Sequence, residues 1–433
     1  MVNSNGTLRK AVYIDGGRTP FLKSSTGFKQ LNSYDLARMA IQSLLTKTQI
    51  DPDKVDWVIM GRVIGDISNS NVARDAALAA GIPNHTPAAT VTLACVSANK
   101  AITNAVDLIQ TGQADIVIAG GTESLTDIPI RYRKKFRMKL VESQRYKKPL
   151  DWLSFFKGLK FSDVLPEIPA IAEFTTGRSM GQDCDRMAAR IGVTREEQDR
   201  YAMRSHLNAA KATENGNLAD EIFPAAVPPK FSVIDKDNGF RDDTTMASLG
   251  KLRPAFVKPY GTLTAGNSSF LTDGASAVLI MSEDAAKAHG FQPKAVFKSY
   301  AYTAQNPDDE LLLGPAYATP KVLDKLGLSL SDIDVFEFHE AFAAQMVANL
   351  KCLNSDKFAQ EKLGRSSKVG EVPEDKLNNW GGSLSIGHPF GATGGRLVAT
   401  AVNRLIKEDG QLALIASCAA GAVGNAIILE RYA

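Results

Sequence analysis

The chain has 433 residues, of which 50 are Lys or Arg and 47 are Asp or Glu, so its formal net charge is only +3. With 44% hydrophobic and 22% charged residues, its composition excludes a disordered, collagen-like or coiled-coil protein. The length corresponds to about three domain-sized units, and no segment approaches the ~20 consecutive apolar residues of a membrane-spanning helix.

Strand-like apolar runs alternate with helical patterns along the first part of the chain. Alternation of this kind is typical of an α/β protein built around a buried, mostly parallel sheet. In chain order, the expected elements are a strand at 11–14, a helix at 34–45, a strand at 57–60, a helix at 71–80, a strand at 90–93, a helix at 96–111 and a strand at 116–119.

The middle of the chain, residues 130–251, has a looser pattern and is interpreted as an inserted, mainly helical loop domain. Its clearest helix is expected at 194–213. Residues 131–161 contain eleven Lys or Arg and only two acids, a net charge of +9, which leaves −6 on the rest of the chain. The small overall charge therefore hides a strongly basic segment.

Aromatic residues interleave the basic ones in this segment. Trp152, Phe155, Phe156 and Leu159 follow the i, i+3, i+4, i+7 spacing of one helix face. Such a face suits a flap packed on its own protein, an anionic membrane surface or a partner subunit, and the residues alone leave all three open. Nucleic acid is disfavoured, because no other feature resembles a nucleic-acid-binding fold.

The last third of the chain repeats the order of the first. Residues 55–61 resemble 333–339, and residues 114–121 resemble 410–417, which indicates an internal duplication. The expected elements are a strand at 335–338, a helix at 342–350, a helix at 391–405 and strands at 412–415 and 426–429.

Cysteine usage indicates a reduced, cytoplasmic protein. Four cysteines in so long a chain are too few and too scattered for a disulfide framework. No Cys-x-x-Cys pair is present and the five histidines lack metal-ligand spacing, so no metal site is expected. Residues 1–7 lack the basic and apolar regions of a signal peptide.

Cys95 is the first candidate for chemistry, because it follows an expected strand and opens an expected helix. The partial positive charge and free N–H groups of a helix N-terminus lower the pKa of a thiol and favour the nucleophilic thiolate. The competing interpretation is a small buried apolar filler. The position at a strand–helix turn makes the two interpretations equally strong.

His388 lies within a glycine-rich loop at residues 381–395. The glycines allow close approach of backbone and ligand, and imidazole is the natural base for a cysteine nucleophile. The loop fits neither the G-x-G-x-x-G nor the Walker pattern, so nucleotide binding is not predicted.

Cys418 and His339 are the remaining candidates, each at the end of an expected strand. Small residues around Cys418 are expected to expose its thiol and to leave backbone N–H groups accessible to an oxyanion. His339 taken singly is an ordinary loop histidine, but the carboxyl ends of strands are where α/β proteins place their sites.

Together these residues stand in motifs that closely resemble those of one family, the thiolases, over residues 10–433. The motifs are Gly387-His388-Pro389-x-Gly391-x-Thr393-Gly394, His339-Glu340-Ala341-Phe342, Cys418-x-x-Gly421, Gly17-Arg18-Thr19-Pro20-Phe21, Lys251-Leu252-Arg253-Pro254-Ala255-Phe256 and Leu271-Thr272-Asp273-Gly274-Ala275. Within the family, the chain most resembles the thiolase (β) subunit of the fatty-acid trifunctional complex. The features that point there are His339 where most thiolases have Asn, the run at 124–131 and the basic insertion.

The resemblance implies a thiolase fold of the α/β class. Two topologically similar βαβαβαββ halves would form a layered α/β/α/β/α core with an inserted, mainly helical loop domain. The N-terminal half is expected at 1–129, completed by about 252–284, the loop domain at 130–251 and the C-terminal half at 285–433.

The resemblance also implies cleavage of a 3-ketoacyl-CoA by CoA in fatty-acid β-oxidation, without a tightly bound cofactor. Cys95 would be the acylated nucleophile, His388 its general base and Cys418 the second acid and base. His339 would belong to one oxyanion hole, and the N–H groups of Cys95 and Ala420 to another, although many thiolases carry Gly where this chain has Ala420.

For CoA, the resemblance places Ser269 beside the pantetheine, Arg241 near the adenosine phosphates and Met180 at the acyl entrance. It further implies a homodimer, with a hydratase/dehydrogenase α subunit as the favoured partner of 131–161 and peripheral membrane contact second. Three alternatives stay open: a biosynthetic acetyl-CoA acetyltransferase, a ketoacyl synthase, and a non-catalytic scaffold with the same fold.

Overall fold

The computed structural model describes residues 8–167 and 172–433. Residues 1–7, on which the signal-peptide prediction rests, lie outside the described residues. Within the described ranges, no helix combines the length and apolarity needed to cross a membrane.

The core is a mixed sheet that has ten strands within the described residues, in the order β12-β13-β14-β11-β1-β10-β5-β3-β4, with β2 paired to β10. Pairing is parallel between β3 and its neighbours β4 and β5 and between β12 and β13, and antiparallel elsewhere in the sheet. The strands are β1 (Ala11–Arg18), β2 (Leu22–Lys23), β3 (Trp57–Gly61), β4 (Ala88–Val91), β5 (Ile116–Glu123), β10 (Thr272–Ser282), β11 (Ala295–Ala304), β12 (Val335–Phe338), β13 (Leu412–Ala419) and β14 (Val423–Arg431).

The prediction of a mostly parallel sheet is therefore wrong, because two central antiparallel strands were missed. β10 is buried along its whole length but carries Thr, Asp, Gly and Ser, so it does not read as an apolar run. β11 mixes buried with half-exposed residues. Boundaries also shift by two residues, since β4 spans Ala88–Val91 and α14 spans Thr393–Lys407.

The sheet consists of two similar halves that meet where β1 pairs with β11 at Val12 and Val296. In each half, one strand has an antiparallel neighbour on one side and a parallel neighbour on the other. In the N-terminal half β5 lies between β10 and β3, and in the C-terminal half β13 lies between β14 and β12. The predicted repeats are these same elements, β3 with β12 and β5 with β13. β4 has no matching strand in the second half of the described chain.

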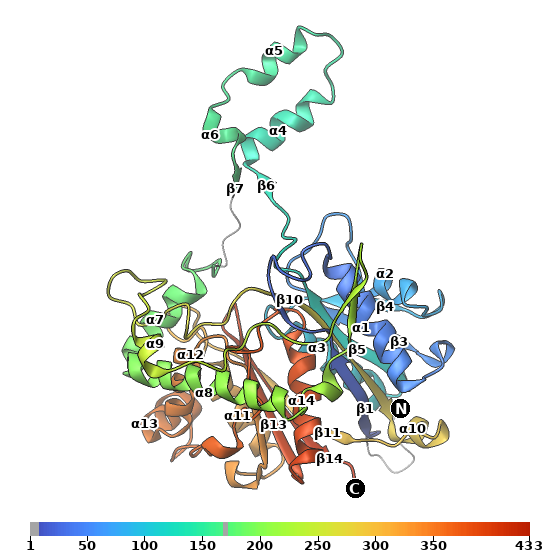
Figure 1. The fold of residues 1–433 in the computed structure, drawn as a ribbon, viewed down its shortest axis with the longest axis vertical. Coiled ribbons are helices and arrows are strands. Elements are labelled where there is room, and N and C mark those ends of the chain that lie inside the picture. Colours follow the sequence, from blue (N-terminus) through green and yellow to red (C-terminus); the bar gives the residue numbers. More distant parts are fainter. Residues whose placement is uncertain (1–7, 168–171) are drawn as a thin grey trace.

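Helices separate and cover the two half-sheets, as Figure 1 shows. α3 and α14 lie between them and share one apolar cluster with both, whereas α1 and α2 cover the N-terminal half and α11 and α12 the C-terminal half. This is the expected α/β/α/β/α layering. The helices are α1 (Ser33–Thr48), α2 (Val72–Ala79), α3 (Ser97–Gln110), α10 (Glu283–Ala288), α11 (Gly314–Asp324), α12 (Ala343–Leu353), α13 (Asp356–Phe358) and α14 (Thr393–Lys407).

The two central helices approach each other closely at Gly394. A Cβ atom there would lie 2.1 Å from Oδ1 of Asn99 on α3. Asn99 in turn donates its amide N–H to Oδ1 of Asn425 on β14 at 2.9 Å. Because α3 and α14 begin beside each other, the residues that precede them are brought together.

Between the halves, the chain forms a helical loop region and a projecting hairpin. The elements after the hairpin are α7 (Met180–Ile191), α8 (Arg195–Glu214), β8 (Ala225–Val227), β9 (Ser232–Ile234) and α9 (Met246–Gly250). α8 begins with a capping box in which Thr194 and Glu197 bond each other's backbone N–H groups, and this explains why its N-terminus was predictable.

Residues 131–167 form a projecting arm that stands away from the body at one end of the molecule (Figure 1). The arm contains β6 (Arg131–Tyr132), α4 (Lys134–Ser143), α5 (Asp151–Phe156), α6 (Phe161–Val164) and β7 (Pro166–Glu167). Its helices pack on one another, with Phe155 buried against Phe136, Trp152 and Phe156.

One expectation about this segment, a continuous helical stripe from Trp152 to Leu159, is wrong. Helix α5 ends at Phe156 and Gly158 takes a positive φ of 75°, so Leu159 does not continue the helical stripe. The stripe is also not covered by the protein's own core, because Trp152 stays 48% and Phe156 67% exposed.

Candidate active site

A cavity of about 510 Å³ opens at the ends of the strands and beside the starts of the two central helices. It is lined by Cys95, His388, Cys418 and Ala420, which sequence motifs had singled out. Its remaining wall is largely apolar and is contributed by the residues Val63, Ile64, Phe256, Leu271, Leu312, Phe342 and Phe390, among others.

Cys95 lies in the turn between β4 and α3, where Ala94 takes a positive φ of 45°. Burial raises the pKa of the Cys95 thiol to about 12, although hydrogen bonds from the backbone N–H groups of Ala420 and of Cys95 itself lower it. The expected thiolate-favouring shift is therefore wrong: desolvation outweighs the donors at this helix start. The resting residue is a neutral thiol that needs a base.

His388 is held as a neutral base. The hydroxyl of Thr393 donates to the carbonyl of Pro389 at 3.0 Å, so its oxygen accepts from Nδ1–H of His388 at 2.7 Å. This tautomer leaves a lone pair on Nε2, which is buried and has no hydrogen-bond partner. Burial, with the nearby Arg396 cation, lowers the pKa of His388 to about 3.

His339 has the opposite tautomer. Ser383 accepts from Nη2 of Arg396 at 3.0 Å, and among the described residues Nδ1 of His339, at 3.0 Å, is the acceptor left for the proton of the Ser383 hydroxyl. Nε2 of His339 then carries the ring proton and is a donor, again buried and without a partner. Burial, His388 and Arg396 hold the pKa of His339 well below its ordinary value of 6.5.

The nucleophile and both imidazoles converge. The ring centroids of His339 and His388 are 4.1 Å apart. Sγ of Cys95 and one ring nitrogen of each histidine lie within 4.8 Å of one another. Cys95 precedes α3 and His388 precedes α14, so the two occupy equivalent positions in the two halves.

Cys418 faces the same cavity from β13 but is only 1% exposed, so the expectation of an exposed thiol is wrong. The neighbouring strands bury it, since β13 pairs with β12 on one side and β14 on the other. Burial, and then the nearby Cys95, raise the pKa of Cys418 far above its ordinary value. Cys418 is thus a protonated thiol at neutral pH.

Glu340 organises the loop behind His339, a role that its place in the motif did not reveal. Its buried carboxylate accepts from Tyr201 at 3.1 Å, Ser205 at 2.7 Å and the amide of Asn378 at 2.6 Å. It also accepts the N–H of Leu384, beside Ser383, at 3.2 Å. The Ser383 hydroxyl that sets the His339 tautomer is positioned through this carboxylate.

Glu123, at the end of β5, was also missed by sequence reasoning. Its buried carboxylate accepts backbone N–H groups from Val63 at 3.1 Å, Ile64 at 3.0 Å and Gly391 at 2.9 Å. Glu123 thereby joins the cavity wall near Cys95 to the loop that carries His388. Burial raises the pKa of Glu123 to about 7, although the N–H groups lower it.

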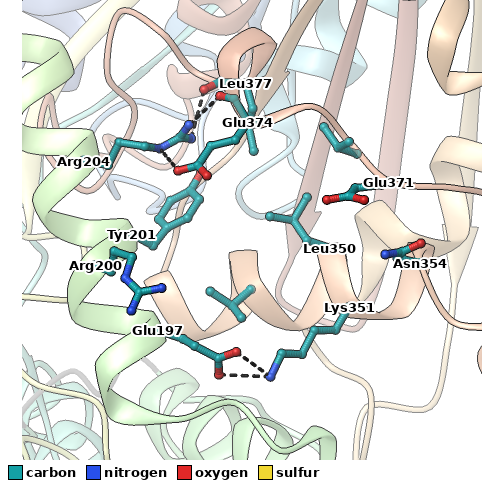
Figure 2. Close-up of a pocket in the computed structure, with 12 residues that line it drawn as sticks. Glu197, Arg200, Tyr201, Arg204, Leu350, Lys351, Asn354, Glu371, Glu374 and Leu377 are labelled. Carbon is teal, nitrogen blue, oxygen red and sulfur yellow. Dashed lines mark hydrogen bonds and ion pairs between the residues drawn. The ribbon is translucent and has the colours of Figure 1, made fainter.

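A second cavity, of about 300 Å³, lies between α8 and α12 and is drawn in Figure 2. Charged side chains line it, including Lys351 paired with Glu197 at 2.8 Å. Its floor includes Tyr201, whose hydroxyl reaches Glu340. None of the residues singled out from the sequence lines this second cavity.

The structure separates the residues expected to bind CoA. Ser269 and Met180 line the active-site cavity, and the N–H of Ser269 donates to the carbonyl of Ala341 at 3.0 Å. Arg241 is exposed and does not line it. Arg241 donates its backbone N–H to Nδ1 of His206, a buried residue, at 3.2 Å.

Comparison with known families agrees with this architecture. Residues 11–284 match the family described as "Thiolase, N-terminal domain", and residues 291–431 match "Thiolase, C-terminal domain". The chain belongs to the thiolase family.

This thiolase chain is 54% identical over 425 residues to "Trifunctional enzyme subunit beta, mitochondrial" of Bos taurus, covering 98% of this chain and 89% of that protein. It is 50% identical over 421 residues to "Probable 3-ketoacyl-CoA thiolase" of Caenorhabditis elegans, covering 97% and 94%. The crystal structure of human mitochondrial 3-ketoacyl-CoA thiolase superposes with a TM-score of 0.83 at 32% identity, covering 99% of this chain and 100% of that chain.

The predicted family, the thiolase fold and the acyltransferase activity are thereby confirmed. The predicted role, cleavage of 3-ketoacyl-CoA in fatty-acid β-oxidation, is confirmed as well. Coenzyme A is a substrate of thiolases.

Proposed function

We propose that the protein cleaves 3-ketoacyl-CoA with CoA through an acyl thioester on Cys95, giving acetyl-CoA and an acyl-CoA shortened by two carbons. One observation carries this assignment: a neutral thiol, an unpartnered imidazole lone pair on His388 and the Ala420 N–H converge in one cavity. A thiol, a base and an oxyanion donor are what acyl transfer to sulfur requires.

In the first half-reaction, Nε2 of His388 accepts the proton of the Cys95 thiol, and sulfur attacks the 3-keto carbon. The N–H groups of Cys95 and Ala420, which already donate toward the sulfur, stabilise the resulting oxyanion. Ala420 stands where many thiolases have glycine. It keeps the oxyanion donor, because alanine and glycine have the same backbone N–H.

Cleavage of the carbon–carbon bond then leaves the acyl group on Cys95 and expels the enolate of acetyl-CoA. The enolate oxygen accepts from Nε2–H of His339 and from the now protonated His388. The carbon takes its proton from Cys418, whose raised pKa keeps it a thiol until that step. Opposite tautomers thus give the two histidines different tasks.

In the second half-reaction, the CoA thiol loses its proton to the Cys418 thiolate, or to His388 once that imidazolium has passed its own proton to Cys418. The CoA sulfur then removes the acyl group from Cys95. Ser269 contacts the pantetheine at the cavity, Met180 borders the acyl chain, and Arg241 meets the adenosine phosphates outside it. No tightly bound cofactor enters these steps.

The apolar lining of the cavity favours degradation of longer chains over the biosynthetic joining of two acetyl-CoA molecules. Phe256, Leu312 and Phe342 offer apolar surface that an acetoacetyl group does not fill. Thiolysis rates for acetoacetyl-CoA and a long-chain 3-ketoacyl-CoA test this choice. Strict preference for acetoacetyl-CoA would favour the biosynthetic alternative.

Mass spectrometry after brief exposure to acetoacetyl-CoA tests the mechanism itself. The expected result is one acetyl group on Cys95, absent in Cys95→Ser and present in Cys352→Ser, which alters a buried cysteine that does not line the active-site cavity. Unmodified and inactive wild-type protein would favour the non-catalytic scaffold.

The arm carries the proposed partner surface, toward a hydratase/dehydrogenase α subunit. Its basic residues stand beside exposed apolar side chains such as Leu153 at 69% and Phe161 at 82%, and the bovine relative is named a subunit of a trifunctional enzyme. Co-purification with such a partner, lost on removal of the arm, is expected. Sedimentation with anionic vesicles instead would favour a peripheral membrane role.

A homodimer is proposed from the sheet edge. β4 ends the sheet and has no partner on its outer side within the described chain, and its four residues are all partly exposed. An edge strand of this kind pairs readily with a second copy. Sedimentation velocity of the wild type and of a Thr90→Pro variant tests the proposed dimer. Proline has no backbone N–H, so the variant loses a donor for pairing with the strand of a second copy.

The cytoplasmic location predicted from the sequence stays a prediction, as does the division of the chain at residues 129, 251 and 285. The bovine relative is named mitochondrial. Fluorescence microscopy of the tagged full chain decides between the two compartments.

A further inference from the structure

Three metal-ligand atoms meet at the active site. Sγ of Cys95 and one ring nitrogen each of His339 and His388 lie within 4.8 Å of one another. The Nδ1 atoms are engaged by Ser383 and Thr393, so the Nε2 atoms are the ones left to bind a ligand. Both Nε2 atoms lack partners, and the two side chains are only 0% and 3% exposed.

This donor set has the chemistry of a site for a thiophilic divalent ion. Thiolate sulfur and neutral imidazole are the ligands that Zn²⁺ prefers, at about 2.3 Å and about 2.0–2.1 Å. Tetrahedral geometry at those lengths needs ligand atoms about 3.5 Å apart, a contraction of roughly 1 Å from the present upper limit. The cluster has no carboxylate, so it does not suit Mg²⁺ or Ca²⁺.

Both imidazoles are buried, and burial favours the neutral form of the ring, which is the form that binds a metal. Their hydrogen-bonded Nδ1 atoms hold the rings in place, as metal-site histidines commonly are held. The cavity supplies an entrance and room for a water molecule as the fourth ligand. Spacing along the sequence could not reveal this site, because its members come from three separate segments.

We propose that Cys95, His339 and His388 bind one Zn²⁺ ion and that the bound ion blocks acylation. The Cys95 S–H bond breaks and its proton passes to solvent as the sulfur–zinc bond forms. His388 supplies the Nε2 lone pair, and His339 moves its ring proton from Nε2 to Nδ1, where the Ser383 oxygen accepts it. Water completes the tetrahedron, and no oxidant is needed.

Bound Zn²⁺ occupies both the sulfur that attacks and the nitrogen that takes its proton. Inhibition therefore rests on the proposed function, whereas metal binding rests only on the geometry. Removing one of three protein ligands is expected to weaken the affinity more than tenfold, since losses of about 10–100-fold follow even from removing the groups that orient a ligand.

Cobalt titration of metal-free protein tests the site without relying on activity. One Co²⁺ per chain is expected, with a thiolate-to-cobalt absorption band that Zn²⁺ removes by competition. Cys95→Ser should lose the band, and His339→Asn should weaken binding more than tenfold. Cys352→Ser, at a buried cysteine outside the cavity, should bind as wild type does, and thermal melting checks that each variant is folded.

Three results would overturn the site: no thiolate band in wild type, a band that persists in Cys95→Ser, or an affinity that is unchanged in His339→Asn. Inhibition of thiolysis by Zn²⁺ that a chelator reverses would support the blocking role. Cobalt binding by a metal-free protein that does not acylate Cys95 would support the site while contradicting the proposed function.

Discussion

The active-site cavity and the arm differ in almost every physical respect. Around the cavity, His339, His388 and Cys418 are nearly inaccessible to solvent, and the hydroxyl groups of Ser383 and Thr393 hold the two imidazoles. In the arm, helices of at most ten residues pack mainly on one another and leave large apolar side chains such as Phe156 and Phe161 exposed.

The buried cavity is suited to chemistry, and the exposed arm is suited to association with another surface. Burial sets the protonation states in the cavity, because desolvation shifts the pKa of each thiol upward and of each imidazole downward. Solvent screens the charges of the arm, so its basic residues act on surfaces brought close to it rather than on the cavity. No cavity-lining residue belongs to the arm within the described chain.

The largest expected effect is at the nucleophile. Cys95→Ser should lower thiolysis by more than about 10³-fold, because a hydroxyl is a far weaker nucleophile at neutral pH. Binding through the arm should be unchanged. Steady-state rates together with partner or vesicle binding measure both, and loss of binding would show that the two regions are coupled.

A smaller effect on kcat is expected from Thr393, which orients the base His388. Thr393→Val removes the acceptor of Nδ1–H on His388, so the tautomer is no longer selected and kcat should fall by about 10–100-fold. Thr400→Val is a matched control, because Thr400 is similarly buried on α14 but bonds Glu221 instead. Equal losses in the two variants would mean that α14 stability, not the tautomer, matters.

Glu123→Gln should lower kcat by about tenfold. The NH₂ group of the glutamine side chain cannot accept the backbone N–H groups that a carboxylate oxygen accepts in the wild type. An unchanged kcat with a lower melting temperature would assign Glu123 a purely structural role.

The same variant carries a prediction about pH. Because the pKa of Glu123 is raised from 4.5 to about 7 in the fold, its contribution to stability is present below the ordinary value and is lost as pH rises through about 7. The melting temperature of Glu123→Gln relative to wild type should therefore rise between about pH 4.5 and 7 and level off above that range. A constant difference would contradict the raised pKa.

The smallest effect on catalysis is expected from the arm. Replacing residues 133–164 by a short Gly-Ser linker should leave acetoacetyl-CoA thiolysis within about twofold of wild type, because solvent-exposed surface away from a site contributes little to it. Partner or membrane binding should disappear. A large loss of kcat would indicate that the arm closes over the cavity.

The pattern of hydrophobic residues was sufficient for strands such as β3, β5 and β13, whose apolar runs are uninterrupted. It was insufficient for β10, where Asp273 and Ser276 are buried because tertiary neighbours satisfy them: Asp273 accepts the N–H of Leu125, and Ser276 donates to the carbonyl of Ala392. A polar residue that finds its partner far away in the chain looks, locally, like a loop residue.

By itself, the sequence determined the thiolase family, the two-fold repeat of the core and the identity of Cys95, His339, His388 and Cys418 as the candidate residues, because each stands in a local motif. Only the tertiary structure decided their protonation states. A helix start predicts an acidic thiol, but the surrounding sheet and helices remove water from Cys95 and raise its pKa instead. Motifs are local in the chain, whereas desolvation and hydrogen-bond direction depend on every segment that packs around the site.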